Sequence, residues 1–86
     1  MPIIATFCGI VIRMYNTGEH NPPHFHAYYQ GTSGTFNFEG DMLEGNLPKR
    51  QQKIVSGWAA LRSEDLKMNW ELAMNHEPLV KIDPVR

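Results

Sequence analysis

The sequence predicts an α+β domain in which a small antiparallel sheet carries two helices packed on one face, in the order β-β-β-(β)-α-α-β. Apolar and polar residues alternate at the strand period through the first half of the chain, and apolar residues recur at helical spacing in the second half. Glycines and prolines fall between these segments, where turns are expected. Because the chain has 86 residues, we expect a single domain, 1–86, with one modest core.

The first half of the chain contains the segments with strand periodicity. After the first of them, Pro22 and Pro23 remove two backbone donors, so no central strand can continue through them. Glycine-containing turns separate the later segments. The predicted strands span Gly9 to Tyr15, His24 to Gln30, Thr35 to Glu39 and a short stretch from Met42 to Glu44.

The turn at Gly31–Gly34 predicts how the second and third of these strands pair. A four-residue turn there would set Gln30 opposite Thr35. Counting back from that pair gives Tyr29 opposite Phe36 and Ala27 opposite Phe38 on an apolar face, with His26 opposite Glu39 on the other face.

The second half predicts two helices. Pro48 suits the first position of a helix that runs to about Arg62, and Ser63 suits the cap of a second helix that ends at Asn75–Pro78. Their apolar stripes are Ile54, Val55, Trp58 and Leu61, then Leu66, Trp70, Ala73 and Met74. We expect both stripes to cover the apolar face of the sheet, with Asn69 bonded to sheet backbone or facing a site. Alternation from Leu79 to Asp83 predicts a last strand.

Charge and cysteine content narrow the classes of function. The net charge of −1 argues against a broad nucleic-acid surface. With one cysteine, Cys8, there is no intrachain disulfide, which favours the cytoplasm; Cys8 itself is interpreted as a small packing residue. The apolar start, Met1 to Met14, is too short to span a membrane and has no signal-peptide anatomy, so we expect no membrane partner.

Three histidines within seven residues form the densest chemical feature. His24 and His26 are two residues apart on a predicted strand, so they point the same way, and His20 can reach them from the loop. One interpretation is that these three histidines bind zinc or another divalent transition metal. Glu39 would then be a fourth ligand or would orient one of the imidazoles. A metal-free role is a second interpretation: proton transfer by His24, His26 and Glu39, or binding of a phosphate or a partner by the histidines. Ordinary loop hydrogen bonds and a His26–Glu39 cross-strand pair are a third.

Lys49, Arg50 and Lys53 form a cationic group at the start of the first predicted helix. Together with the helix N-terminal amides they could bind a phosphate or an acidic partner; the alternative is a solvated helix face. No helix-turn-helix, zinc-finger, RNA-recognition or nucleophile-elbow signature is present, so nucleic acid is weakly supported as a partner and enzymatic activity stays open.

The order of several motifs resembles a known bacterial family, domain of unknown function 4160. The motifs are M-P-I-I with G-I-V-I-R-M-Y, H-N-P-P-H-F-H-A-Y-Y, F-E-G-D-M-L-E-G-N-L-P-K-R and L-K-M-N-W. The resemblance spans about Pro2 to Pro84. Its most specific parts are H-x-P-P-H-F-H, here His20 to His26, and L-x-G-x-L-P-x-R, here Leu43 to Arg50.

The resemblance implies a small cytoplasmic bacterial domain without an agreed activity. Genes of this family often lie beside genes of a second small family, domain of unknown function 2442. This implies an interaction module in a toxin–antitoxin-like gene pair, with a small protein partner or a homodimer. The alternatives are a nuclease-like or other phosphate-cleaving enzyme using His20, His24 and His26 with Glu39, and a non-catalytic metal-binding protein.

Overall fold

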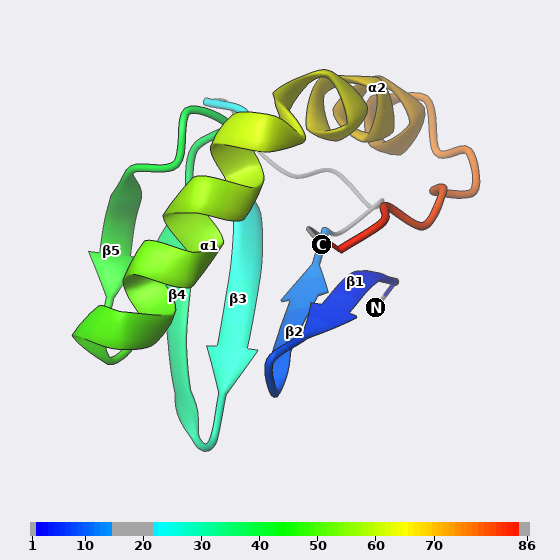
Figure 1. Ribbon diagram of the computed structural model, residues 1–86. Helices are drawn as coiled ribbons and strands as arrows, with labels where there is room; N and C mark the ends of the chain where they lie inside the picture. The colour runs from blue at the N-terminus through cyan, green and yellow to red at the C-terminus, as the bar shows by residue number, and fades with distance from the viewer. Residues whose placement is uncertain (1, 15–21, 85–86) are drawn as a thin grey trace.

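The computed structural model describes residues 2–14 and 22–84 of the 86-residue chain. In this part of the chain five strands precede two helices, which confirms the predicted α+β class (Figure 1). The elements are β1 (Ile3–Phe7), β2 (Ile10–Arg13), β3 (Phe25–Tyr29), β4 (Thr32–Phe36), β5 (Met42–Gly45), α1 (Lys49–Leu61) and α2 (Ser63–Met74). Neither of these helices is long and apolar enough to cross a membrane.

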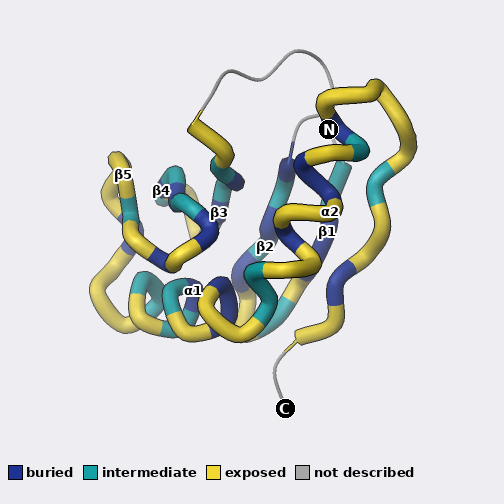
Figure 2. The backbone as a smooth tube through the Cα atoms, turned by 90° about the horizontal axis from the view of Figure 1, so that it is seen from above, coloured by how far each residue is buried: buried dark blue, intermediate teal, exposed yellow. Residues whose placement is uncertain are grey.

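The sheet is an antiparallel meander in the order β1-β2-β3-β4-β5, so β1 and β5 are its edges. Both helices lie on one side of the sheet: α1 runs across β3, β4 and β5, and α2 continues beyond it (Figure 1). Seen from above, the buried stretches of the strands and helices face one another (Figure 2). The core therefore lies between the sheet and the helices, as expected.

Aromatic rings make up the centre of this core. Phe25 stacks on Phe36 with ring centroids 5.5 Å apart, and meets the edge of Trp58 at 5.7 Å. Phe36 and Ala27 are fully buried, and Phe38 and Trp70 are nearly so. The prediction that the apolar face of the β3–β4 hairpin packs against the helices is therefore confirmed for Trp58 and Trp70. Leu61 and Met74 are exposed, so their assignment to the buried stripes is wrong.

The predicted pairing within that hairpin is wrong by four residues. Gln30 and Gly31 form a two-residue turn, with φ of 44° and 80°. Two consecutive positive φ angles give a hairpin turn whose twist matches that of the strands, which favours it over a longer loop. The pairs are Tyr29–Thr32, Tyr28–Ser33, Ala27–Gly34, His26–Thr35 and Phe25–Phe36.

Gly34 belongs to β4 and not to the turn. A Cβ at this position would lie 3.0 Å from Met42 Sδ and 3.1 Å from a Phe36 ring carbon, so neighbouring side chains fill the space above this glycine. The register differs from the predicted one by an even number of residues, so each β4 side chain keeps its face. His26 is consequently paired with Thr35 and not with Glu39.

The N-terminal apolar stretch is a β-hairpin: β2 corresponds to the predicted strand from Gly9 to Tyr15, and β1, which was not predicted, precedes it. Cys8 (φ 51°) and Gly9 (φ 74°) turn the chain between β1 and β2. Cys8 is exposed there, so its interpretation as a packing residue is wrong. The turn is difficult to predict from the sequence, because apolar residues lie on both sides of it and no polar segment marks it. The end of the predicted strand, Tyr15, lies outside the described residues.

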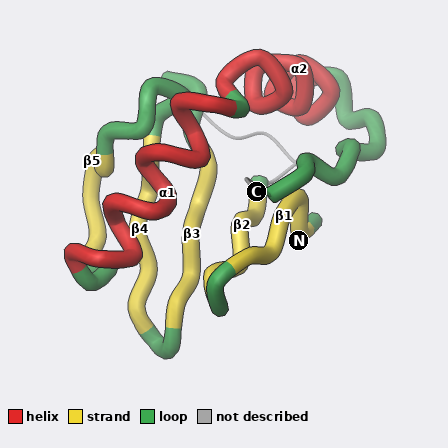
Figure 3. The backbone as a smooth tube through the Cα atoms, in the orientation of Figure 1, coloured by secondary structure: helices red, strands yellow, loops and turns green. Residues whose placement is uncertain are grey.

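The predicted last strand, 79–83, is a loop. It returns from α2 to the side of β1 (Figure 3), where the Ile82 N–H donates to the Ile4 carbonyl at 2.7 Å and the Ile82 side chain is buried. Val80 is 51% exposed, so the alternation of Val80 and Ile82 marks neither a strand nor a buried face. The prediction that Ser63 caps the second helix is wrong: Ser63 is the first residue of α2, and Arg62 occupies the cap position without a side-chain capping bond.

Candidate functional site

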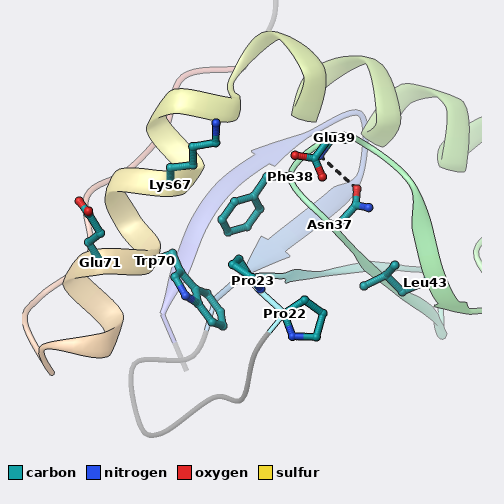
Figure 4. Close-up of a pocket in the computed structure, with 9 residues that line it drawn as sticks. All are labelled: Pro22, Pro23, Asn37, Phe38, Glu39, Leu43, Lys67, Trp70 and Glu71. Atoms are coloured by element: carbon teal, nitrogen blue, oxygen red, sulfur yellow. Dashed lines mark hydrogen bonds between the residues drawn. The ribbon is translucent and has the colours of Figure 1, made fainter.

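A pocket of about 460 Å³ opens where the segment before β3, the β4–β5 connection and α2 meet (Figure 4). We call it the Pro–Trp pocket. It is lined by Pro22, Pro23, Asn37, Phe38, Glu39, Leu43, Lys67, Trp70 and Glu71. Its volume lies within the range of ordinary ligand pockets. Residues up to 49 positions apart in the sequence thus meet at one surface feature.

Apolar side chains form the inside of the Pro–Trp pocket. The rings of Phe38 and Trp70 meet edge to face, with centroids 6.0 Å apart, and both belong to the core. Pro22 and Pro23 form one wall, and Leu43, which is 48% exposed, lies on the side of the pocket away from Trp70 and α2 (Figure 4). The pocket therefore offers an apolar surface that the described chain does not cover.

A tight turn after β4 holds one rim of the pocket. The Asn37 side-chain oxygen accepts hydrogen bonds from the backbone N–H of Glu39 at 3.1 Å and of Asp41 at 2.9 Å. The Ser56 hydroxyl donates to the Gly40 carbonyl at 2.6 Å, which fastens the turn to α1. Glu39 is exposed, and its carboxylate lies above the Phe38 ring (Figure 4).

The opposite rim comes from one face of α2. Lys67, Trp70 and Glu71 follow at spacings of three and four residues, which places them side by side on a helix. The Lys67 ammonium lies 3.4 Å from the Glu64 carboxylate, one turn earlier. Two carboxylates and one already paired ammonium therefore border an aromatic floor.

His24 joins the proline wall to the aromatic floor. Its Nδ1 lies 2.8 Å from the Pro22 carbonyl oxygen. A carbonyl only accepts, so Nδ1 carries the proton and, in the neutral ring, Nε2 carries the lone pair. The His24 ring also lies 5.3 Å from the Trp70 ring and 5.1 Å from the His26 ring, centroid to centroid. The histidine motif thus supports the pocket from behind.

The structure does not bring the other predicted site residues together in one site. The structure brings His24 and His26 together, and His26 Nδ1 lies 3.5 Å from the Thr35 hydroxyl. Glu39 lies in the pocket rim, and His20 is outside the described residues. Within residues 2–14 and 22–84 no three His, Cys, Asp or Glu side chains are grouped as metal ligands.

The predicted cationic group, Lys49, Arg50 and Lys53, lies at the start of α1 and is exposed. Figure 1 places this end of α1 away from the junction with α2, where the pocket opens. A 13-residue helix separates the two ends by about 20 Å. The histidines and these cations therefore do not form one site.

Fold and pocket together define a small α+β domain with one face that carries an open, largely apolar pocket. A family model, Domain of unknown function (DUF4160), matches residues 9–71, which is more than half of the chain. The chain therefore belongs to the DUF4160 family. No curated protein and no solved structure matches it significantly. Every pocket-lining residue lies inside the matched range, whereas the C-terminal loop lies outside it.

Sequence reasoning missed this pocket as a unit. It assigned Phe38 and Trp70 to the core, and both rings indeed contact core rings, but each also has a face in the pocket. The signal that could have found it is in the two specific blocks of the family resemblance. Pro22 and Pro23 come from one block and Leu43 from the other, and the structure brings them together.

Proposed function

We propose that this protein is a small interaction module whose Pro–Trp pocket receives side chains from an extended segment of a partner protein. The observation that carries the proposal is an open pocket with an apolar floor, built by three separate segments of the family domain. Burial of exposed apolar surface is the main favourable term in protein association. Covering the apolar surface of this pocket with a partner's side chains therefore lowers the free energy of the complex.

The geometry of the sheet favours an extended polypeptide as the occupant. β5 is an edge strand, and Leu43 on β5 lines the pocket. A strand that paired with the edge of β5 would therefore run past the pocket mouth and place alternate side chains beside it. At the other edge, the C-terminal loop bonds to Ile4 of β1 and partly occupies it.

We further propose that the partner is a small protein encoded beside this one, in a bacterial toxin–antitoxin-like pair of the cytoplasm. The family resemblance supports a neighbour of the domain of unknown function 2442 type. The lone cysteine supports a reducing compartment. A second copy of the chain is the competing occupant of the same edge, since unblocked edge strands pair readily.

The arrangement of charged groups favours binding over phosphate cleavage. A phosphate-cleaving site would need an acid/base group and cations around one substrate. His24 is engaged with Pro22 and Trp70 behind the pocket, while Lys49, Arg50 and Lys53 stand at the far end of α1. We therefore treat the histidines as supports of a binding pocket.

Co-expression with the neighbouring small protein tests the proposal. We expect the two proteins to co-purify, and Leu43→Ala to weaken the complex by about tenfold, which corresponds to roughly 1.4 kcal/mol. Leu61→Ala is the matched control, because Leu61 is 69% exposed and does not line the pocket. Equal affinity of both variants, measured by calorimetry, contradicts the proposed site. Sedimentation of the protein alone separates a homodimer from a heteromeric complex.

A further inference from the structure

We infer that the Pro–Trp pocket selects a cationic side chain, arginine above lysine, in the partner's extended segment. The inference rests on the proposed function, because it specifies which residue of the partner enters the pocket. Arginine and lysine have an apolar stem and a charged tip. A pocket suited to them therefore needs an apolar interior and an acidic mouth, and this pocket has both.

The interior supplies the surface for the stem and the face for the cation. Trp70 and Phe38 line the pocket with the small parts of these residues that stay exposed, 7% and 4%, and Pro22 and Pro23 lie along the wall (Figure 4). A cation above an aromatic ring is attracted by the negative face of the ring, and tryptophan is the strongest partner. A planar guanidinium can also stack on the indole, which favours arginine.

The mouth supplies the opposite charge. Glu39 lines the pocket from the turn after β4, and Glu71 lines it from α2. Asp41 belongs to the same turn but does not line the pocket, and its Oδ2 accepts a hydrogen bond from Asn37 Nδ2 at 3.2 Å. The rim also contains one lysine, Lys67, which makes an exposed ion pair with Glu64 at 3.4 Å. Carboxylates thus outnumber ammonium groups around the opening.

Other side chains complement this pocket less well. A glutamate or aspartate would bring another carboxylate beside Glu39 and Glu71, and like charges repel at such distances. A purely aliphatic side chain would cover the rings but would leave the rim carboxylates partly desolvated without a partner. The cationic cluster of this chain lies at the start of α1, so the acidic mouth is a local property that the net charge of −1 hides.

The test uses three capped amino acids as probes: N-acetylarginine amide, N-acetylnorleucine amide and N-acetylglutamate amide. Nuclear magnetic resonance of the ¹⁵N-labelled protein follows the indole N–H of Trp70 during each titration. Trp58 is an internal control, because its indole donates to the Asp83 carbonyl from inside the core. We expect the arginine probe to shift the Trp70 signal with millimolar affinity, at least fivefold tighter than norleucine, and the glutamate probe to leave it unshifted.

Two carboxylate variants and one control test the acidic mouth. Glu39→Gln and Glu71→Gln should each weaken the arginine probe about threefold. Glu77→Gln should have no effect, because Glu77 is exposed after α2 and does not line the pocket. Unchanged arginine affinity in both pocket variants overturns the inference.

The outcomes separate this inference from the proposed function. If norleucine binds as tightly as arginine, the pocket binds side chains without selectivity for charge. The inference is then wrong, but the proposed function as an interaction module is not contradicted. If glutamate binds best, the charge preference is reversed and the inference is wrong. If none of the probes moves the Trp70 signal, the inference is also wrong, and the Leu43→Ala binding experiment decides the proposed function independently.

Discussion

The side chain of Asn69 pairs with Val80 as one strand residue pairs with another. Asn69 Nδ2 donates to the Val80 carbonyl at 2.8 Å, and the Val80 N–H donates to Asn69 Oδ1 at 2.8 Å. Asn69 is fully buried on α2. One amide side chain thus satisfies both backbone groups of a residue in the C-terminal loop, which is why this loop needs no ladder to stay in place.

The same loop is held by two more residues of the helices. The Trp58 indole N–H donates to the Asp83 carbonyl at 3.2 Å, and Arg62 Nε donates to the same carbonyl at 3.1 Å. Arg62 also reaches the Pro84 carbonyl at 3.1 Å. The donors lie within the matched family range of 9–71, whereas the loop that accepts from them lies beyond it.

Replacing Asn69 with leucine should therefore destabilise the protein. Leucine has a similar volume but cannot bond, so the Val80 N–H and C=O lose their part-buried hydrogen-bond partners. We expect a loss of about 2–4 kcal/mol in the free energy of unfolding, measured by urea denaturation. Asn75→Ala is the control, because Asn75 is exposed at the end of α2. Equal midpoints for Asn69→Leu and the parent would show that the pair contributes nothing.

Trp58→Ala tests the assignment of the core. Trp58 is buried, and its ring lies 5.1 Å from Phe7 and 5.7 Å from Phe25, centroid to centroid. Removing it leaves a large cavity and should cost about 3–5 kcal/mol, which is a large fraction of the stability of so small a domain. Thermal unfolding followed by circular dichroism measures the effect. Leu61→Ala, at an exposed site on the same helix, should melt like the parent.

Local periodicity predicted the α+β class, both helices and the core face, but it could not set the register of the hairpin. The periodicity of β3 and β4 is unchanged by a shift of two or four residues, so the pattern defines faces and not partners. The choice between a four-residue turn and the observed Gln30–Gly31 turn depends on backbone twist, which the residue pattern does not report.

The candidate site was predictable in its parts and not as a whole. The His20 to His26 block was singled out from the sequence, and His24 does touch the pocket lining. The pocket itself depends on how α2 lies against the β4–β5 connection. That contact joins Glu39 to Lys67 and Trp70, and no local rule of spacing reaches between segments so far apart in the chain.

Gly40→Ala should disturb the turn that carries Glu39. Gly40 has φ of 97°, and a Cβ there would lie 2.6 Å from the Ser56 carbonyl oxygen in α1. Backbone strain and a backbone clash together should cost about 2–4 kcal/mol. Gly31→Ala is a matched control, because Gly31 also has a positive φ, 80°, but no atom lies within 4 Å of the added Cβ.

We therefore expect Gly31→Ala to lose about 1 kcal/mol, from backbone strain alone. Chemical denaturation of both variants gives the comparison. If Gly40→Ala is no less stable than Gly31→Ala, the close approach of Gly40 to the Ser56 carbonyl in α1 is contradicted. The same samples can be titrated with N-acetylarginine amide, and a weaker shift at Trp70 in Gly40→Ala would link this turn to the pocket.

His24 should matter for the shape of the pocket more than for the stability of the fold. The residue is half-buried, so His24→Ala should lower the free energy of unfolding by about 1 kcal/mol or less. It would release both the Pro22 carbonyl and one side of the Trp70 ring. We expect about five- to tenfold weaker binding of the partner protein, measured by calorimetry, because a loosened wall must be reordered on binding.

His24→Asn separates the two roles of this side chain. An asparagine amide nitrogen can still donate to the Pro22 carbonyl, but it has no ring to lie against Trp70. Binding close to the parent level would assign the effect to the hydrogen bond, and binding as weak as in His24→Ala would assign it to the ring. His26→Ala is the control on the neighbouring position, where the side chain approaches Thr35 and does not line the pocket. If His26→Ala weakens binding more than His24→Ala, the histidines form a site of their own and do not support the Pro–Trp pocket.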